Sequence, residues 1–297
     1  MKRYFIFILT FLTIGLVKSQ SSEIGICAGT SFYLGDLNPK GLFQGSRFAG
    51  GLLFRYNINP RFAFKATALF GGLYADDAKT GTTERNLNFR SNLSELSAQM
   101  EINFLKLYNE QGKNCISPYL FAGISVFAFN PQSEYNGKWY DLQALGTEGQ
   151  GLNQTDSYGN TYDKKRYSLT NVAIPFGIGI RINFLQYYCI GVEWGFRYTF
   201  TDYLDDVGGY YVDRDLLIEY RSQLIADLSD RTTAVTTDSE GNSIPDYHKA
   251  GTARKTNNAN DWYSFLTLNF SFKISDVIKN CSSPLRSKNT KHLPKRK

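Results

Sequence analysis

In the stretch Tyr188-Cys-Ile-Gly-Val-Glu-Trp-Gly-Phe-Arg-Tyr-Thr-Phe200, apolar and aromatic residues occupy every even position. The odd positions hold small residues together with Glu193 and Arg197. Since successive side chains of a β-strand point to opposite faces, one face is apolar and the other is partly polar. A soluble sandwich buries the apolar face, whereas a transmembrane barrel presents it to lipid and turns the polar face into the lumen. One strand does not distinguish these folds, but the rest of the chain does.

Period-two alternation between turn residues predicts eight strands in all. They are 24–34, 48–58, 61–75, 91–104, 117–130, 167–184, 188–200 and 261–274. Long connections (35–47, 76–90, 131–166 and 201–260) alternate with short ones (59–60, 105–116 and 185–187). Bacterial outer-membrane barrels have an even strand number, short periplasmic turns and long external loops. The sequence therefore predicts an all-β fold, an eight-stranded antiparallel transmembrane β-barrel in the outer membrane, with both termini periplasmic.

Nine charged or amide side chains fall on the inward face of these strands. They are Arg55, Lys65, Glu95, Gln99, Glu101, Arg181, Glu193, Arg197 and Lys273. The interior of an eight-stranded barrel is just wide enough for side chains to fill it, and unpaired buried charge is costly. We therefore expect a paired polar network that fixes the strand register. A proton path or selective pore is the functional alternative for the same residues.

Two of the predicted strands depart from simple alternation. Strand 117–130 is apolar on both faces, so the sequence does not show which face points inward. Pro175 lacks a ladder donor, so we expect a bulge in strand 167–184. Among the four cysteines, Cys27 and Cys189 both face inward, as small buried thiols or as a disulfide.

The chain divides into three parts. Residues 1–19 have the features of a secretory signal peptide, with Lys2 and Arg3 ahead of an apolar run and a cleavage site after Ser19; a signal anchor is the alternative. Residues 20–274 form the predicted barrel, and 275–297 form a basic tail. No later run of about 18 apolar residues predicts a transmembrane helix.

The basic charge of the chain is concentrated at its ends. The net charge is +6, while the tail alone has seven Lys and Arg residues against one Asp. The overall charge is therefore no argument for a nucleic-acid partner. The tail is either a disordered solubilising segment or a docking arm for an acidic partner or membrane surface.

No catalytic, cofactor or metal site is predicted. Of the two histidines, His248 could meet Asp205 or Asp206 at the loop rim, as a barrel hydrolase would require, but no motif supports this. The pairs Asp76-Asp77 and Asp205-Asp206 could hold calcium, although solvated loop charge is the expectation. The glycine-rich segment 146–151 follows no βα unit, so we expect flexible turns rather than a phosphate site.

The longest connection is predicted to contain a helix. Asp213 can cap it, and apolar residues recur at helical spacing. These apolar residues are Leu216, Leu217, Tyr220, Leu224, Ile225 and Leu228. We expect this helix to belong to a folded cap; binding a partner is the alternative.

Several segments, in this order along the whole barrel region, are similar to the PorG-like outer-membrane proteins of the Bacteroidetes type IX secretion system. They are SFYLGDLN (31–38), FRYNINPR (54–61), RNLNFRS (85–91), SPYLFAGI (117–124), FNPQSEYNGKWYDLQ (129–143), GTEGQG (146–151), EWGFRYTFTDYLDDV (193–207) and NDWY (260–263). The basic tail after Cys281 is longer than this family's pattern, so no tail function carries over.

The resemblance implies a non-enzymatic barrel without cofactors that tethers a periplasmic ring to the outer membrane and supports secretion and gliding. The implied partners are a ring lipoprotein and its partner subunit, besides outer-membrane lipid. By topology, the contacts should involve 57–61, 105–116, 185–187, the N-terminus and the tail. The basic residues expected there are Lys106, Lys113, Lys288, Lys291, Lys295, Arg296 and Lys297. Alternatives are a small adhesion or transport barrel and a barrel hydrolase.

Overall fold

The computed structural model describes residues 21–39, 41, 43–105, 115–184, 187–256 and 259–274. The predicted signal segment and basic tail, with Cys281, lie outside these ranges, as do Lys106 and Lys113. In the described part of the chain, no helix is long and apolar enough to cross a membrane.

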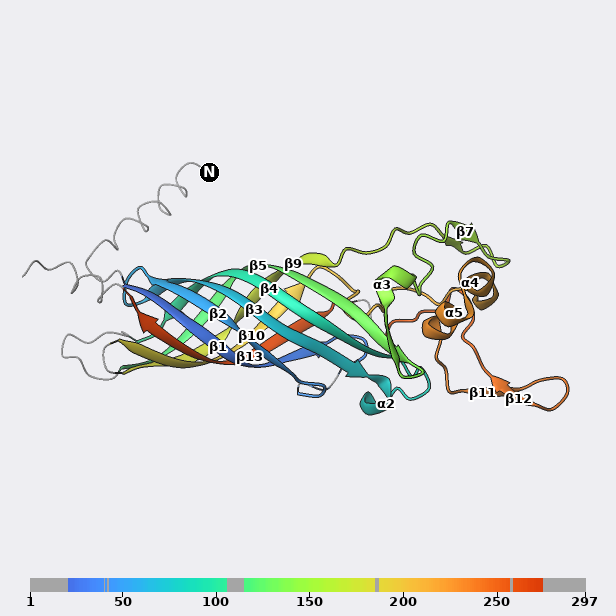
Figure 1. Cartoon of the computed structure of the whole chain (residues 1–297), viewed down its shortest axis with the longest axis horizontal. Helices are drawn as coiled ribbons and strands as arrows, with labels where there is room; N and C mark the ends of the chain where they lie inside the picture. Colours follow the sequence, from blue (N-terminus) through green and yellow to red (C-terminus); the bar gives the residue numbers. More distant parts are fainter. Residues whose placement is uncertain are drawn as a thin grey trace, which may run out of the picture.

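Eight antiparallel strands close into a barrel in which each strand pairs with its neighbours along the chain (Figure 1). They are β1 (Ser21–Leu34), β2 (Arg47–Asn57), β3 (Phe62–Asp76), β4 (Asn88–Asn103), β5 (Cys115–Tyr135), β9 (Thr170–Phe184), β10 (Tyr188–Thr199) and β13 (Trp262–Lys273). The pairings of β4 with β5 and of β1 with β13 complete the circle. The predicted fold is confirmed.

The long connections lie at one end of the barrel, here called the cap end, and the short turn between β2 and β3 lies at the other, the turn end (Figure 1). The cap-end elements are α2 (Asp77–Thr80), β6 (Lys138–Asp141), α3 (Leu142–Leu145), β7 (Gln154–Thr155), β8 (Thr161–Tyr162), α4 (Arg214–Tyr220), α5 (Gln223–Ser229), β11 (Val235–Thr237) and β12 (Ser243–Pro245). Sorting the connections in this way is typical of an outer-membrane barrel.

The outward face of the strands is apolar. Phe48 is 76% exposed and Ile124 is 70% exposed, and along β9 every second residue from Val172 to Ile182 is an exposed apolar one. Water would disfavour such a continuous apolar surface, whereas lipid matches it. The barrel is therefore of the membrane type, as predicted.

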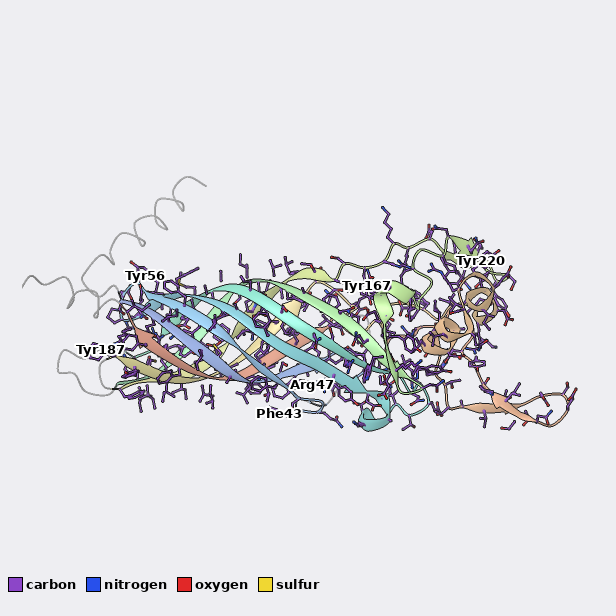
Figure 2. All side chains as sticks on the ribbon, viewed as in Figure 1. Phe43, Arg47, Tyr56, Tyr167, Tyr187 and Tyr220 are labelled. Atoms are coloured by element: carbon purple, nitrogen blue, oxygen red, sulfur yellow. The ribbon has the colours of Figure 1, made fainter. Side chains whose placement is uncertain are left out.

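Aromatic residues flank this apolar band. At the turn end, Tyr188 packs on Phe184, Phe270 and Phe272, and Figure 2 shows Tyr56 and Tyr187 at the same end. Toward the cap end, Tyr198 and Trp262 pack edge to face. Ten residue steps along β10 separate the two levels, about 25 Å at a rise of roughly 3.4 Å and a tilt of roughly 40°. This matches the height of the apolar band of outer-membrane barrels.

Strands β4 and β5 run on beyond the apolar band. Their outward side chains are apolar as far as Leu96 on β4 and Ala128 on β5, and then become polar, as at Arg90 and Gln132. Residues Asn136 and Gly137, both with positive φ, form the tight turn that joins β5 to β6. An Asn-Gly pair favours such a turn, because both residues tolerate the left-handed conformation. The predicted strand 117–130 was therefore too short, since it ended where the outward polarity changes.

The structure has no bulge at Pro175, so this prediction is wrong. The register between β5 and β9 is the same on both sides of Pro175: Ala122 pairs with Phe176, and Ser125 pairs with Ala173. The pairing lapses only over the two residues in between, with no residue inserted. Since Pro175 has no N–H to donate, the ladder opens locally and both strands keep their phase. The open phase of 117–130 is settled as well, with Tyr119, Phe121 and Phe127 pointing inward.

The interior is filled in two layers. Near the turn end it is charged, and nearer the cap end an apolar cluster includes Leu53, Leu69, Phe127 and Phe265. This cluster continues out of the barrel into the connections, where Leu37, Leu87, Leu204 and Val207 join it. The base of the cap is thus packed into the mouth of the barrel.

Candidate functional site

All nine predicted lumen residues are buried inside the barrel, none more than 7% exposed. Glu101 is at the centre of the network. Its carboxylate accepts from Arg55 (2.9 Å) and Arg181 (3.1 Å), and lies 3.2 Å from Lys65 Nζ. One carboxylate therefore meets three cations from three different strands.

Other carboxylates share these cations. Arg55 also pairs with Glu23 (2.9 Å), and Lys65 also pairs with Glu193. Glu23 accepts from Asn57 (2.8 Å) and Ser271 (2.9 Å), and Glu193 accepts from the Tyr119 hydroxyl (2.7 Å). Almost every charge thus has both an opposite charge and a hydrogen bond, which is what makes buried charge tolerable.

Glu23 was missed in the sequence, because the predicted first strand began at residue 24, three residues after the observed start of β1. Its odd number places it on the same face as Cys27, so a strand beginning at Ser21 would have included it. With Glu23, the lumen holds four carboxylates rather than three against five cations. The network is closer to neutral than the sequence indicated.

A second, separate ion pair lies nearer the apolar layer. Arg197 donates to both oxygens of Glu95 (3.0 and 3.1 Å), and the Tyr263 hydroxyl donates to Glu95 (2.7 Å). The guanidinium also lies over the ring of Phe265, 4.7 Å from its centroid.

The two remaining predicted lumen residues are Gln99 and Lys273. Gln99 donates to Ser97 (2.7 Å). Lys273 is buried near the turn end, with Glu23 opposite it in the register.

The cysteine alternatives are settled for two residues. Cys27 and Cys189 are both free and buried, at inward positions on β1 and β10. The predicted small buried thiols are confirmed, and no disulfide joins this pair.

The mouth of the barrel holds a buried acidic junction. The Tyr33 hydroxyl, on β1, contacts a carboxylate oxygen of Asp205 and one of Asp261 (2.7 Å). The other oxygens of the two carboxylates accept from the backbone N–H of Val207 and Leu204, each at 2.9 Å. Burial, and then the charges of Asp36 on Asp205 and of Asp205 on Asp261, raise the pKa of both carboxyls well above their usual range.

Asp206 faces the opposite way. It accepts from Thr147 and from Tyr167 (2.7 Å), and its backbone has a φ of 68°. This left-handed conformation, which Asp tolerates better than most residues, turns two adjacent carboxylates in opposite directions. The prediction of solvated charge at Asp205-Asp206 is wrong, since both are buried and hold the cap on the barrel.

Two arginines connect the long connections to one another. Arg85 binds both oxygens of Asp77 at 2.7 Å and donates to the backbone carbonyls of Asp36 (3.0 Å) and Arg254 (3.1 Å). Asp77 is buried as well, so solvated charge was the wrong expectation there too. Together these contacts join connections that are more than 200 residues apart in sequence.

Arg254 is the second of these arginines. Its guanidinium donates to the carbonyls of Ser229 (3.0 Å) and Asp206 (2.6 Å) and to the Glu148 carboxylate (3.3 Å). Glu148 also accepts from the backbone N–H of Gly208 and Gly209. The segment 146–151 is therefore not a set of flexible turns: its left-handed glycines bring Thr147 and Glu148 into this buried cluster.

The predicted helix of the longest connection is two short helices. Asp213 caps α4 as predicted, but the backbone breaks at Arg221, and Ser222 caps α5 through the N–H of Ile225. A capping serine within the apolar pattern is the signal that the sequence interpretation missed. The two helices pack with β8 and with Leu152 just before β7 around a core of their own, which makes this connection a folded cap. The core residues are Leu152, Tyr162, Val212, Leu217, Ile225 and Ala226.

The hypothetical pairing of His248 with Asp205 or Asp206 does not form. His248 Nδ1 lies 3.0 Å from Asp230, and its ring is stacked on Tyr211 at 4.1 Å. Both aspartates are instead occupied at the junction described above. Within the described ranges, no group of three or more His, Cys, Asp or Glu side chains could hold a metal ion.

The acidic junction predicts a pH dependence of the cap. One phenol proton cannot satisfy two carboxylates, so burial and repulsion favour the protonated form of the Asp205–Asp261 pair. A carboxyl whose pKa is raised on folding stabilises the fold fully below its unfolded pKa of about 4, and this stabilisation is lost as pH rises through the folded pKa. Hydrogen exchange of residues 201–256 should therefore become faster from pH 5 to pH 9, beyond the intrinsic rate.

Asp205→Asn is the matched variant for this measurement, because it keeps an acceptor for Tyr33 and removes one titrating group. Its protection should depend less on pH than that of the wild-type chain. Equal pH dependence in both proteins would show that this pair does not control the cap.

Comparison with known proteins gives one family. The profile described as "Domain of unknown function (DUF6089)" matches residues 2–144 and 151–221. A search of curated proteins returned no match.

Solved structures with a likeness to this chain include bacterial outer-membrane and surface proteins. Neisserial surface protein A is 9% identical with a TM-score of 0.37, and OprG of Pseudomonas aeruginosa is 10% identical with a TM-score of 0.37. Ail of Yersinia pestis, in complex with a heparin analogue, is 7% identical with a TM-score of 0.35. Each alignment covers 86% of this chain and 97% of the other. At these scores the fold rests on the strand pairing itself rather than on the likeness.

Proposed function

The chain belongs to the DUF6089 family, and from that starting point we propose that it is a non-enzymatic outer-membrane component of a type IX secretion system. In this role the barrel anchors a periplasmic ring to the outer membrane and supports protein secretion and gliding. The turn end faces the periplasm and meets the ring lipoprotein and its partner subunit, while the cap lies outside the cell. The segments similar to PorG-like proteins are the reason for choosing this system.

The packed interior is the observation that carries the proposal. Charged side chains paired around Glu101 fill one layer of the lumen, and the apolar cluster around Phe127 fills the next. The base of the cap is packed into the mouth. A barrel filled in this way suits a rigid anchor, whereas a channel needs a continuous polar path.

Deletion of the gene in the native host tests the proposal. We expect cargo proteins of the secretion system to accumulate in the periplasm, and the intact gene to restore their release. Unchanged secretion in the deletion strain would refute the proposed role.

Two complementing variants separate the alternatives. His248→Asn should restore secretion fully, because the proposed role needs no chemistry; loss of secretion at a normal barrel level would favour a barrel hydrolase. Replacing Lys288, Lys291, Lys295, Arg296 and Lys297 by glutamine tests whether the tail docks on the ring. If the tail is a docking arm, secretion should fall although the barrel inserts normally.

A further inference from the structure

The cap contains a cavity of about 320 Å³ that the proposed anchoring role does not use. Three parts of the chain surround it: the β7–β8 hairpin with the turn before it, the segment from Tyr203 to Tyr210, and the turn at Gly251. The lining consists mainly of tyrosines and small polar residues. Small-molecule sites combine aromatic walls with a few placed polar groups, in volumes from about 300 Å³ upward.

Two of the aromatic walls are held in place before any ligand arrives. The Tyr162 hydroxyl donates to Asp156 (2.7 Å) and accepts from the backbone N–H of Asp213 (3.3 Å). Tyr203 is stacked on Tyr167, with centroids 4.6 Å apart. Because these tyrosine side chains are already fixed, they lose little conformational entropy when a ligand packs against them, which favours binding.

Tyr210 is the third aromatic residue and differs from the other two. Its ring is 53% exposed, and Lys164 Nζ lies 6.0 Å from its centroid. Neither side chain is needed for the core of the cap, so both are free to contact a ligand at the rim of the cavity. An exposed tyrosine at a cavity rim offers a flat apolar face to a bound ring.

The floor residues have unused hydrogen-bonding capacity. Gln150 Oε1 accepts from the backbone N–H of Glu148 (3.0 Å). This bond uses the oxygen of the side-chain amide and not its Nε2 donor group. In the described part of the chain, Gln150 Nε2 and Glu148 Oε2 are both buried without a regular hydrogen bond, and the Tyr203 hydroxyl is a weaker neighbour of the Glu148 carboxylate. Buried polar atoms in native proteins are nearly always matched by protein, water or ligand.

We propose that this cavity binds a neutral saccharide unit at the cap. A sugar hydroxyl is both donor and acceptor, so neighbouring hydroxyls can serve an orphan amide donor and an orphan carboxylate acceptor together. The apolar C–H face of a pyranose ring suits the tyrosine walls, and the volume accommodates about one or two such rings. Glu148 is already paired with Arg254, so the floor does not demand a cationic ligand. This inference does not depend on the secretion role.

Saturation-transfer NMR on the full chain tests this, in a detergent without a sugar headgroup. The probes are glucose, galactose, mannose, N-acetylglucosamine, cellobiose and chitobiose, with tri-alanine as a peptide probe. At least one saccharide should bind with a Kd on the order of 1 mM or tighter. Tyr210→Ala should weaken that binding on the order of tenfold, since it removes the rim aromatic from a site whose floor is intact.

The matched control is Tyr220→Ala, which removes a comparably exposed tyrosine from α4, outside the cavity lining. It should leave saccharide binding unchanged. The proposal is overturned if no saccharide binds at millimolar concentration, or if only tri-alanine binds. It is equally overturned if Tyr210→Ala binds as well as the wild type, because the sugar would then be bound elsewhere.

Discussion

Replacing Glu101 by glutamine is expected to lower the free energy of unfolding of the barrel by about 3–5 kcal/mol or more, because it leaves buried cations without their counter-charge. The wild-type carboxylate contacts Arg55, Lys65 and Arg181, and all four side chains are at most 2% exposed. Glutamine keeps the size of the side chain, so the loss reports charge rather than a cavity. Glu23 and Glu193 can compensate only part of it.

Urea-induced unfolding in lipid vesicles, followed by the fluorescence of Trp194 and Trp262 on the barrel wall, measures this effect. Glu134→Gln is the matched control, because Glu134 is exposed on β5 beyond the apolar band. It should change the stability by less than about 0.5 kcal/mol. If Glu101→Gln were as stable as this control, the lumen network would not hold the barrel together.

Replacing Arg254 by leucine is expected to open the cap while the barrel remains folded. The guanidinium is the cation beside both Glu148 and Asp206, and it also donates to the backbone of Ser229. Its removal leaves two buried carboxylates without a counter-charge, which should destabilise the closed cap by about 3–5 kcal/mol at neutral pH. Burial raises the pKa of both carboxyls already, so the loss should become smaller at low pH, where they take up protons.

Hydrogen exchange resolves the two parts of the molecule. In Arg254→Leu, peptides from residues 201–256 should lose protection, whereas peptides from β10 should keep it. Lys255→Leu is the control, because the neighbouring Lys255 pairs with Asp202 in a partly exposed contact, which is worth at most about 1 kcal/mol. Equal protection of the cap in both variants would mean that Arg254 is not the residue that holds it.

The strands of the barrel could be predicted from sequence because a pleated strand in a membrane wall has to alternate. Residues such as Val192 and Trp194 lie on the lipid side, and Glu193 between them meets the lumen. The same rule fixed the inward positions of Arg55 and Glu101 without any knowledge of their partners. The errors in the predicted strands lie at their ends, where alternation gives little signal. At the beginning of β1, for example, the predicted strand did not include Glu23.

The junction and the cap could not be predicted in this way. Tyr33, Asp205 and Asp261 are brought together from sequence separations of 172 and 228 residues. No local pattern reports such a contact, and exposed loops are the ordinary place for Asp and Glu. Two local signals were present in the sequence. Ser222 is a helix-capping residue and marks the start of α5, and Asn136-Gly137 is a typical hairpin pair and marks the turn between β5 and β6.

Some of the segments similar to PorG-like proteins contribute residues to this junction. Tyr33 and Asp36 lie in the segment 31–38, Arg85 lies in 85–91, and Asp205 lies in 193–207. At the barrel mouth the Tyr33 hydroxyl contacts Asp205, and Arg85 donates to the backbone carbonyl of Asp36. Three of the similar segments therefore supply contacts that seat the cap on the barrel, while others, such as 117–124 on β5, belong to the membrane wall.

Affinity purification of a tagged full chain from native outer membranes in mild detergent, with cross-linking and mass spectrometry, tests the proposed anchoring role most directly. We expect a periplasmic ring lipoprotein and its partner subunit to co-purify, cross-linked to 57–61, 105–116, 185–187 or the tail. Recovery of the barrel alone, or with cross-links confined to the cap, would contradict the anchoring role.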